Sequence, residues 1–338
     1  MGSGVVCFGE VLLRLNAPGR ELLLQSPQLQ VYIGGAEANV AVSLARYGHA
    51  ASMVTVVPDS ALGLACIAEL RRHGVRTEGV QTAPGRLGVY FMATGAGHRP
   101  SEIIYDRADS AFALSAGERV DWDQQLEGAE WLHMSGITPA LGIRAAEAAL
   151  HAARAARERG LSVSFDCNYR AKLWDAWQGD PVRILHELVD QSDLVFADDR
   201  ALALILGLEV PAAPPAERFR HAAESAFGAF PNLQRLATTV RLEHSVDHHE
   251  MSAILMSRER FTVARTYSLE AIVDRIGTGD AFAAGILHGC LNGLDDEATL
   301  DFALAAACLK HSIPGDFNLV GVADVEQMLA GRGFAVRR

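Results

Sequence analysis

Short apolar segments with β-strand character alternate with longer segments of helical periodicity along most of the chain. Strands are predicted over residues 5–10, 52–57, 131–134, 161–166, 194–197, 233–240 and 251–256. Helices are predicted between them, for example over residues 59–73 and 144–159. This alternation is typical of an α/β fold whose mainly parallel sheet is covered by helices on both faces. Ligands of such sheets bind beyond the carboxyl ends of the strands, so functional residues are expected there.

Two regions interrupt the alternation. Residues 86–93 and 102–105 are predicted to form two short strands around a turn over residues 94–100, as in a β-hairpin. The mixed pattern of residues 11–31 indicates a strand at its start and a loop over the remainder. A small β-element is therefore expected beside the main sheet.

Composition limits the class of protein and of partner. The chain has 338 residues, of which 49% are hydrophobic and 21% charged, and no linker separates two folding units. We therefore expect one large domain with an appendage. The formal net charge of -11 argues against a nucleic-acid or anionic-membrane partner, and no apolar run is long enough to span a bilayer. A local basic pocket for an acidic metabolite is compatible with this charge.

The cysteines bear on the cellular compartment. Five cysteines are dispersed along the sequence and form no Cys-x-x-Cys pair: Cys7, Cys66, Cys167, Cys290 and Cys308. Such a set indicates reduced thiols that pack as small hydrophobic side chains. No signal-peptide pattern follows Met1. The chain is therefore predicted to be cytoplasmic.

A glycine-rich turn late in the chain is a candidate anion site. Residues 274–280 read Asp-Arg-Ile-Gly-Thr-Gly-Asp, after a β-type run over residues 271–273 and before an apolar helical segment. Free amides in the first turn of a helix attract phosphate, and glycine lets the phosphate approach the backbone. Asp280 would repel a resting phosphate unless it removes a proton from the attacking group. The alternative is that the aspartate only caps the helix.

A second glycine-rich turn opens another helix. Residues 34–39 read Gly-Gly-Ala-Glu-Ala-Asn and lead into a helical segment that ends near Gly48. Paired glycines permit close approach of a ligand, and Asn39 offers both a donor and an acceptor. Close packing of the helix against a strand is the alternative reason for the glycines.

Several polar residues follow predicted strands and should lie along one rim of the sheet. They are Glu10, Asn168, Arg170, Asp198 and Asp280. Each has a simpler explanation, because Arg170 could be solvated and Asp198, with Asp199, could cap a helix that begins near Arg200. Their combination with two glycine-opened helices favours a binding site.

These segments resemble a known family. Residues 34–39 and 274–280 are similar to the two signature regions of ribokinase-like sugar kinases, the PfkB family. The resemblance covers nearly the whole chain. Five further stretches are similar to those of the 2-keto-3-deoxygluconate kinases within this family: residues 105–108, 133–140, 166–170, 172–174 and 310–320.

The resemblance implies a fold and an activity. The expected fold is a ribokinase-like three-layer α/β/α sandwich with a mainly parallel central sheet and a small β-lid. The large domain would comprise residues 1–10, 34–85 and 108–338, and the lid residues 11–33 and 86–107. The expected reaction is ATP-dependent phosphorylation of 2-keto-3-deoxygluconate to its 6-phosphate. ATP, Mg²⁺ and, as in some relatives, K⁺ are the implied cofactors. An exposed β-lid would have free strand edges, so a homodimer that pairs the lids is also expected.

Residue roles also follow from the resemblance. Asp280 matches the catalytic base, while the amides of Gly277, Thr278 and Gly279 match the anion hole. The positions that match contacts to the keto-deoxy acid are Gly35, Asn39, Tyr90, Tyr105, Arg107, Arg170 and Asp280. Arg107 is also expected to approach the transferring phosphate. Arginines suit an acidic sugar because they make forked bonds to carboxylates, and the base is expected to be ionised on the rim.

The nucleotide side departs from the family pattern. Asp198 and Ala201 stand where many members have the Asn and Glu of an Asn-x-x-Glu motif. Mg²⁺ would then be held mainly by ATP phosphates and water. Arg241 is expected to contact an ATP phosphate, with a structural salt bridge as the equal alternative. Asp274 is a candidate for a monovalent-cation site or for a structural hydrogen bond to the turn.

Two other functions stay open at this point. One is a different kinase of the same fold, acting on fructose, ribose or 2-keto-3-deoxygalactonate. The other is a sugar-binding regulatory protein that has lost turnover.

Overall fold

The computed structural model of the chain describes residues 4–117 and 120–331. A ten-stranded sheet forms its centre. Its strands are β1 (Gly4–Phe8), β4 (Ala50–Pro58), β5 (Val80–Ala83), β8 (Trp131–Ser135), β9 (Ser162–Asp166), β10 (Leu194–Phe196), β11 (Arg235–Glu243), β12 (His249–Ser257), β13 (Phe261–Val263) and β14 (Tyr267–Leu269). They are ordered β13-β12-β11-β10-β9-β8-β1-β4-β5, and β14 also pairs with β12.

The direction of the strands agrees with the sequence pattern. All neighbours from β5 to β11 pair in parallel, whereas β12 is antiparallel to β11, β13 and β14. The predicted α/β fold with a mainly parallel sheet is therefore confirmed. The carboxyl ends of β9, β10 and β11 lie side by side, because these three strands are consecutive in the sheet.

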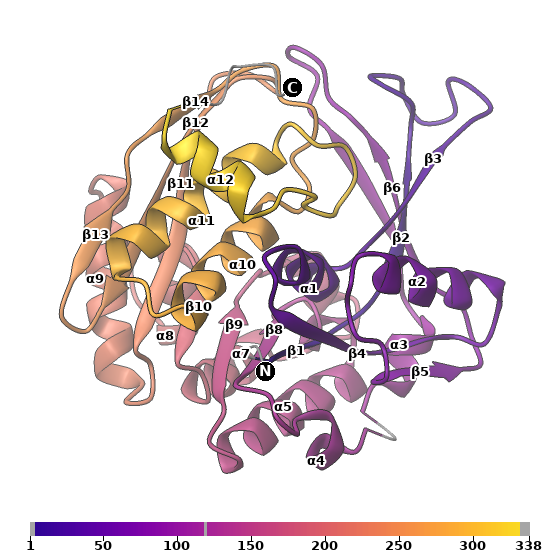
Figure 1. The fold of residues 1–338 in the computed structure, drawn as a ribbon, viewed down its shortest axis with the longest axis horizontal. Helices are drawn as coiled ribbons and strands as arrows, with labels where there is room; N and C mark the ends of the chain where they lie inside the picture. The colour runs from indigo at the N-terminus through magenta and orange to yellow at the C-terminus, as the bar shows by residue number, and fades with distance from the viewer. Residues whose placement is uncertain (1–3, 118–119, 332–338) are drawn as a thin grey trace.

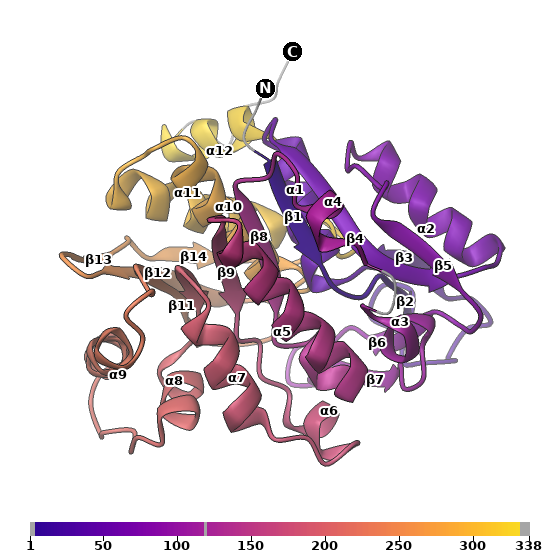
Figure 2. The ribbon, with the colours of Figure 1, turned by 90° about the horizontal axis from the view of Figure 1, so that it is seen from below.

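Helices cover both faces of the sheet (Figure 2). One face packs against α1 (Ala36–Arg46), α2 (Ala61–Arg72), α10 (Thr278–Leu291), α11 (Asp296–Lys310) and α12 (Val322–Leu329). The other face packs against α3 (Ala111–Ser115), α4 (Trp122–Gln125), the 3-10 turn η1 (Pro139–Leu141), α5 (Ile143–Glu158), α6 (Ala171–Asp175), α7 (Pro181–Asp190), α8 (Asp199–Leu206) and α9 (Pro215–Ala229). Successive residues of a strand point to opposite faces, so Val5 and Cys7 of β1 enter one core while Val6 and Phe8 enter the other.

A separate four-stranded sheet forms the lid and stands beside the large sheet (Figure 1). Its strands, in spatial order, are β3 (Gln30–Gly34), β2 (Leu12–Asn16), β6 (Gly88–Ala93) and β7 (Glu102–Asp106). The predicted hairpin is present as the antiparallel pair β6 and β7.

Four strands were not anticipated: β3, β5, β13 and β14. The predicted loop within residues 11–31 ends in β3, which spans residues 30–34 and pairs antiparallel with β2. Gln30 and Val31 are exposed, so this edge strand carries little apolar alternation that could have revealed it. The short strand β5 likewise depends on its pairing with β4 rather than on a local pattern.

The segment before the late glycine turn also differs from the prediction. Residues 271–273 form no strand, and Ala271 has a φ of 54°. The amides of Val273 and Asp274 instead donate to the carbonyl of His311, at 2.9 and 3.2 Å. Ile272 is buried and Val273 is half exposed, so the apolar run serves loop packing. Helix α10 therefore follows an irregular loop that is fixed to the end of α11.

Two further features concern the cysteines and the hydrophobicity of the helices. All five cysteines are free, and all but Cys290 are fully buried. Within residues 4–117 and 120–331, no helix is long and apolar enough to cross a membrane.

Candidate active site

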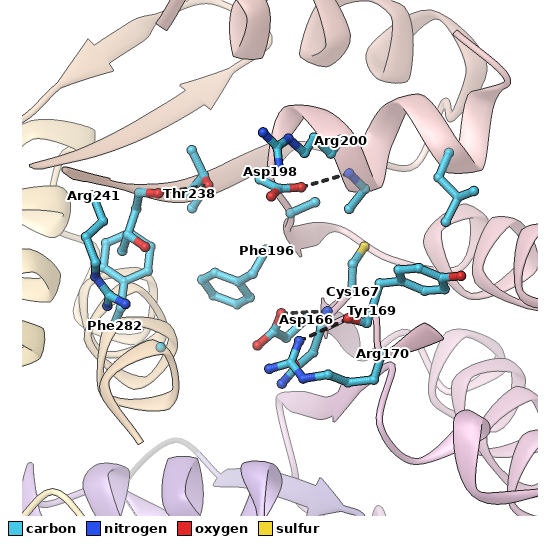
Figure 3. Close-up of a pocket in the computed structure, with 17 residues that line it drawn as sticks. Asp166, Cys167, Tyr169, Arg170, Phe196, Asp198, Arg200, Thr238, Arg241 and Phe282 are labelled. Atoms are coloured by element: carbon cyan, nitrogen blue, oxygen red, sulfur yellow. Dashed lines mark hydrogen bonds between the residues drawn. The ribbon is translucent and has the colours of Figure 1, made fainter. Parts of the chain in front are cut away.

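Two connected cavities open beyond the carboxyl ends of the parallel strands. The first, of about 710 Å³, is lined by residues that include Phe196, Asp198, Thr238 and Arg241, and we call it the sheet cavity (Figure 3). The second, of about 440 Å³, lies between the lid and the start of α10, and we call it the lid cavity. Five residues line both and so mark their junction: Asp166, Asn168, Arg170, Arg241 and Gly279.

The glycine turn supplies free amides to the junction. Gly277 is the N-cap of α10 with a φ of 77°, and no side chain caps this helix. A Cβ on Gly277 would lie 2.0 Å from the carbonyl oxygen of Asp316, so only glycine fits. A Cβ on Gly279 would meet nothing within 4 Å. The first-turn amides of an uncapped helix beside an open space form a suitable phosphate site.

Asp280 does not cap the helix. Its Oδ2 accepts a hydrogen bond of 2.6 Å from Nδ2 of Asn39, which α1 contributes. The two glycine-opened helices therefore meet at this contact. The capping alternative for Asp280 is wrong, because Gly277 occupies the N-cap position.

The electrostatic state of Asp280 differs from expectation. Burial raises the pKa of Asp280 to about 8, while the hydrogen bond from Asn39 acts in the opposite direction. The neighbouring carboxylates of Asp166, Glu37 and Asp316 raise it further. Asp280 is therefore mostly protonated at neutral pH in the unliganded site, although the sequence suggested an ionised carboxylate. A pKa near the working pH suits a group that must accept a proton during a reaction.

The lid contributes aromatic and cationic side chains. Tyr90 of β6 and Tyr105 of β7 line the lid cavity with ring centroids 6.0 Å apart. Arg107 lies beside them, and its Nε donates to Oε2 of Glu10 at 2.8 Å. Glu10 is 2% exposed, with Ser110 as a second partner. Glu10 was expected on the rim of the sheet, but its side chain is buried and pairs with Arg107.

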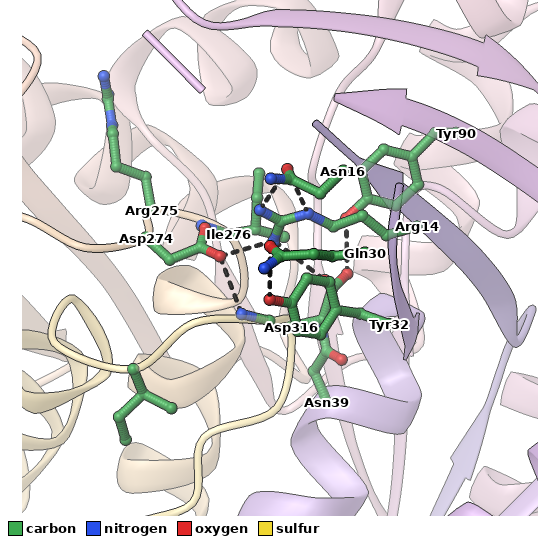
Figure 4. A network of polar contacts seen from close by, with 12 residues as sticks. Arg14, Asn16, Gln30, Tyr32, Asn39, Tyr90, Asp274, Arg275, Ile276 and Asp316 are labelled. Carbon is green, nitrogen blue, oxygen red and sulfur yellow. Dashed lines mark hydrogen bonds and ion pairs between the residues drawn. The ribbon is translucent and has the colours of Figure 1, made fainter. Parts of the chain in front are cut away.

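A buried polar network fixes the lid to the glycine turn (Figure 4). Arg14 of β2 is 1% exposed, and its Nη1 lies 2.8 Å from Asp274 and 3.3 Å from Asp316. Asp316 also accepts a 2.7 Å hydrogen bond from the Tyr90 hydroxyl. Asp274 accepts from the amides of Ile276 and Gly315. Both carboxylate oxygens of Asp274 thus take part in structural contacts, as expected if its role is structural and not cation binding.

At the junction, Arg170 faces solvent and Asp166 lies beneath it. Arg170 is exposed, and within residues 4–117 and 120–331 its side chain donates a single hydrogen bond, from Nη1 to the carbonyl of Tyr169. Burial raises the pKa of Asp166 to about 6, and the charge of Arg170 opposes this shift. Arg170 therefore remains available for an anionic group of a ligand.

The sheet cavity is more open and less internally paired. Asp198 is exposed and caps α8, accepting from the amide of Ala201 at 2.7 Å. Arg241 forms no ion pair within the described part of the chain, so the alternative of a structural salt bridge lacks its acidic partner. Its Nη2 lies 3.4 Å from Oγ1 of Thr278, and its buried Nε has no acceptor. An unsatisfied guanidinium group beside free helix amides fits an anionic ligand.

Metal binding by protein side chains alone is not suggested. Within residues 4–117 and 120–331, no group of three or more His, Cys, Asp or Glu side chains could hold a metal ion. Asp166 and Asp198 are the carboxylates that line the sheet cavity. A Mg²⁺ ion there would depend on ligand phosphates and water, with these carboxylates as supporting groups.

Most residues predicted from the sequence meet in the lid cavity. They are Gly35, Asn39, Tyr90, Tyr105, Arg107, Arg170, Arg241, Gly277, Thr278, Gly279 and Asp280. Asp198 lines only the sheet cavity, and Asp274 lies behind the turn within the Arg14 network. The sequence assigned no role to Asp166, Arg275 or Asp316, which also line the lid cavity. The sequence did carry a signal for Asp166 and Asp316, because both lie in segments that resemble the family.

Comparison with known proteins identifies the family. Residues 3–317 match the family described as pfkB family carbohydrate kinase. The chain belongs to this family. It is therefore an ATP-dependent sugar kinase, a phosphotransferase.

Individual relatives match at least nine tenths of this chain. It is 32% identical to the 2-dehydro-3-deoxygalactonokinase of Haloferax volcanii, over 100% of both chains. It is 27% identical to the 2-dehydro-3-deoxygluconokinase of Thermoproteus tenax, over 92% of this chain and 89% of that one. The crystal structure of 2-dehydro-3-deoxygluconokinase from Thermotoga maritima superposes with a TM-score of 0.92 at 36% identity, covering 97% of this chain and 100% of the other.

Proposed function

We propose that this kinase transfers the terminal phosphate of ATP to the 6-hydroxyl of 2-keto-3-deoxygluconate. The observation that carries the proposal is the lid cavity, which brings a proton acceptor, Asp280, together with two arginines, Arg107 and Arg170. A sugar acid offers a hydroxyl group to Asp280 and a carboxylate group to the arginines. The relatives named above, which are named as kinases of 2-keto-3-deoxy sugar acids, support the same substrate class.

Each residue has a defined task in this reaction. Asp280 accepts the proton of the attacking hydroxyl, and Asn39 orients its carboxylate through the 2.6 Å contact. The amides of residues 277–279 stabilise the charge on the transferring phosphoryl group. The new bond joins the sugar oxygen to phosphorus as the bond between phosphorus and the ADP oxygen breaks. The proton taken by Asp280 leaves to solvent after product release.

The remaining assignments concern the two substrates. Arg241 and Asp198 are assigned to the nucleotide side, where Arg241 would contact a phosphate and Asp198 would contact the hydration shell of Mg²⁺. Gly35 lets the sugar approach the backbone at the start of α1, since its φ of 141° and its contact with Glu10 exclude a side chain. Tyr90 and Tyr105 present ring faces to the sugar carbons.

Arg170 is the better candidate for the substrate carboxylate. Arg107 already pairs with Glu10, whereas the exposed guanidinium of Arg170 forms no ion pair among the described residues. Arg107 can then turn its remaining N–H groups toward the transferring phosphate. This division gives each anionic group of the two substrates its own arginine.

Arg170→Ala tests this division. We expect the KM for 2-keto-3-deoxygluconate to rise about 10- to 100-fold, as for loss of a charged hydrogen-bonded contact, with the KM for ATP unchanged. Steady-state kinetics would measure both values. Arg183→Ala, which removes an exposed arginine paired with Glu187, should change neither. An equal loss with a neutral sugar such as fructose would contradict carboxylate binding by Arg170.

The epimer is the main competing possibility. The Haloferax volcanii relative is named for 2-dehydro-3-deoxygalactonate, so this epimer is a second candidate substrate. A coupled assay of ADP release should be run with both epimers, fructose and ribose. The highest kcat/KM with 2-keto-3-deoxygluconate is expected. Preference for a neutral sugar would overturn the sugar-acid proposal, and no ADP release with any sugar would favour a regulatory protein.

Assembly, location and cation use complete the proposal. All five residues of the lid strand β7 are exposed at a sheet edge, so we propose a dimer that pairs the lids. Light scattering of the full chain would give the mass of the assembly. The dispersed free cysteines favour the reducing cytoplasm. Activation by K⁺ over Na⁺ at constant ionic strength would test the cation role of Asp274.

A further inference from the structure

A second arginine lies beside the phosphate site and was not assigned above. Arg275 lines the lid cavity together with Arg241 and the glycine turn. Adjacent residues of this turn point apart, because Asp274 enters the Arg14 network while Arg275 extends away from it (Figure 4). Arg275 is therefore not part of the buried network that holds the lid.

Arg275 is held by a carboxylate on the neighbouring hairpin. Its Nη2 donates to Oε1 of Glu243 at the end of β11. The side chains of Arg275 and Glu243 are 29% and 55% exposed, so the contact can open without uncovering a buried charge. Exposed ion pairs of this kind contribute little to stability because water screens them, and a ligand with more negative charge can displace the carboxylate.

The ion pair of Arg275 and Glu243 lies next to the phosphate site, as the position of Arg241 shows. Arg241 and Glu243 are two residues apart on β11, so their side chains leave the same face of the strand. Arg241 and Arg275 both line the lid cavity, and the pKa of Arg241 is lowered first by burial and then by the charge of Arg275. Two arginines thus face one carboxylate, and the buried Nε of Arg241 still lacks an acceptor.

The groups at the glycine turn have unused hydrogen-bond donors. The buried Nε of Arg241 has no acceptor, no side chain caps α10, and Arg275 has the exchangeable partner Glu243. A nucleotide phosphate at the glycine turn would supply acceptors for these donors, and arginine binds phosphate in a forked geometry. Glu243 would then be left to solvent, where its exposure makes ionisation inexpensive.

We infer that Arg275 is a phosphate-binding residue that exchanges its resting partner Glu243 for the terminal phosphate of bound ATP. This inference rests on the proposed function for the identity of the ligand. Before ATP binds, the ion pair with Glu243 keeps the guanidinium group of Arg275 beside the cavity. The exchange involves no covalent step, since one ion pair opens and another forms.

The first experiment measures nucleotide binding without sugar. Calorimetry on the full chain should compare Mg²⁺–ATP with Mg²⁺–ADP, because only ATP carries the terminal phosphate. Arg275→Met should lower the affinity for ATP about 10- to 100-fold and leave that for ADP within about twofold. Arg275→Lys, which keeps the charge but not the fork, should recover part of the loss.

The second experiment separates exchange from a purely structural ion pair. Glu243→Gln removes the resting partner, so the affinity for ATP should stay constant or increase up to about threefold. A structural pair predicts that Arg275→Met and Glu243→Gln both weaken ATP binding by a similar factor, and that result would overturn the inference. Arg260→Met removes an exposed arginine paired with Glu297 and should change neither affinity.

The outcomes also distinguish this inference from the proposed function. Selective loss of ATP affinity in Arg275→Met, with no phosphorylation of any sugar acid by the wild-type chain, would support the arginine exchange and reject the proposed substrate. Normal ATP affinity in Arg275→Met, with wild-type turnover of the sugar acid intact, would reject the exchange alone. Absence of ATP binding by the wild-type chain would reject both.

Discussion

The two halves of the site are built differently. Around the lid, charged groups are buried and paired with one another, as in the contacts of Arg14 with Asp274 and of Arg107 with Glu10. In the sheet cavity, Asp198 is exposed and Arg241 has no ion-pair partner within the described residues, and Arg170 at the junction of the two cavities is exposed as well. The lid half therefore has buried ion pairs formed before any ligand arrives, whereas the sheet half and the junction need a ligand to pair their charges.

This difference has a physical basis. A buried ion pair keeps its geometry because opening it would leave an uncompensated charge in a medium of low polarity. An exposed group loses little when its partner changes, because water screens it. Substitutions in the lid half should consequently affect folding or chemistry, and substitutions in the sheet half should affect nucleotide or metal affinity.

Asp280→Asn should have the largest effect, because Asp280 is the proposed proton acceptor of the lid half. We expect kcat to fall about 10²- to 10⁴-fold, the usual contribution of a general base. The shape of the side chain is conserved, so thermal stability and ATP binding should be nearly unchanged. Rapid-quench or coupled assays would measure kcat, and near-normal turnover would disprove the assignment of the base.

Arg14→Met should give the next largest effect, on folding rather than on chemistry. The substitution leaves the buried carboxylates of Asp274 and Asp316 without their cation. We expect a loss of about 3–5 kcal/mol in the free energy of unfolding, measured by urea denaturation. Arg154→Met, which opens an exposed pair with Glu187, should cost no more than about 1 kcal/mol. Equal losses in the two variants would mean that the halves do not differ as described.

The pH dependence of kcat/KM should show the raised pKa of Asp280. The free site titrates near pH 8, and only the ionised carboxylate accepts a proton. The rate constant should therefore rise about tenfold per unit between pH 6 and 7.5 and level off above about pH 8.5. At pH 7, about a tenth of the sites would be ionised. A profile that is flat from pH 6 to 9 would show that the carboxylate is ionised throughout, as the sequence alone suggested.

Local sequence patterns predicted the fold class and much of the site. The turns at residues 34–39 and 274–280 contain glycines with positive φ, Gly35 and Gly277, and each turn precedes a helix start that carries a polar residue, Asn39 or Asp280. The alternating strands and helices likewise carry their own periodicity. These features follow from short-range rules, so the sequence reveals them without a structure.

Long-range pairing could not be read in the same way. Arg14 and Asp316 are 302 residues apart, and nothing near either residue indicates its partner. The raised pKa of Asp280 depends on burial and on three carboxylates from other segments. The run at residues 271–273 has β-type composition, yet the amide of Ile272 donates to the carbonyl of Asp247 and that of Val273 to the carbonyl of His311. Tertiary contacts decided these cases against local propensity.

Asp198 provides the smallest and most specific test of the nucleotide half. The side chain caps α8, so Asp198→Ala should lower the free energy of unfolding by about 1 kcal/mol. Asp198→Asn keeps the cap and removes the charge, and its stability should be unchanged. If Asp198 also contacts the hydration shell of Mg²⁺, Asp198→Asn should raise the Mg²⁺ concentration for half-maximal activity roughly threefold.

Asp295 is the matched control, because it caps α11 through the amide of Ala298 and is exposed. Asp295→Ala should cost a similar amount of stability, about 1 kcal/mol. Asp295→Asn should alter neither stability nor the Mg²⁺ requirement. If Asp198→Asn behaves like Asp295→Asn, Asp198 is only a helix cap. The metal would then depend on ATP phosphates, water and Asp166, which would make the nucleotide half still more dependent on its ligand.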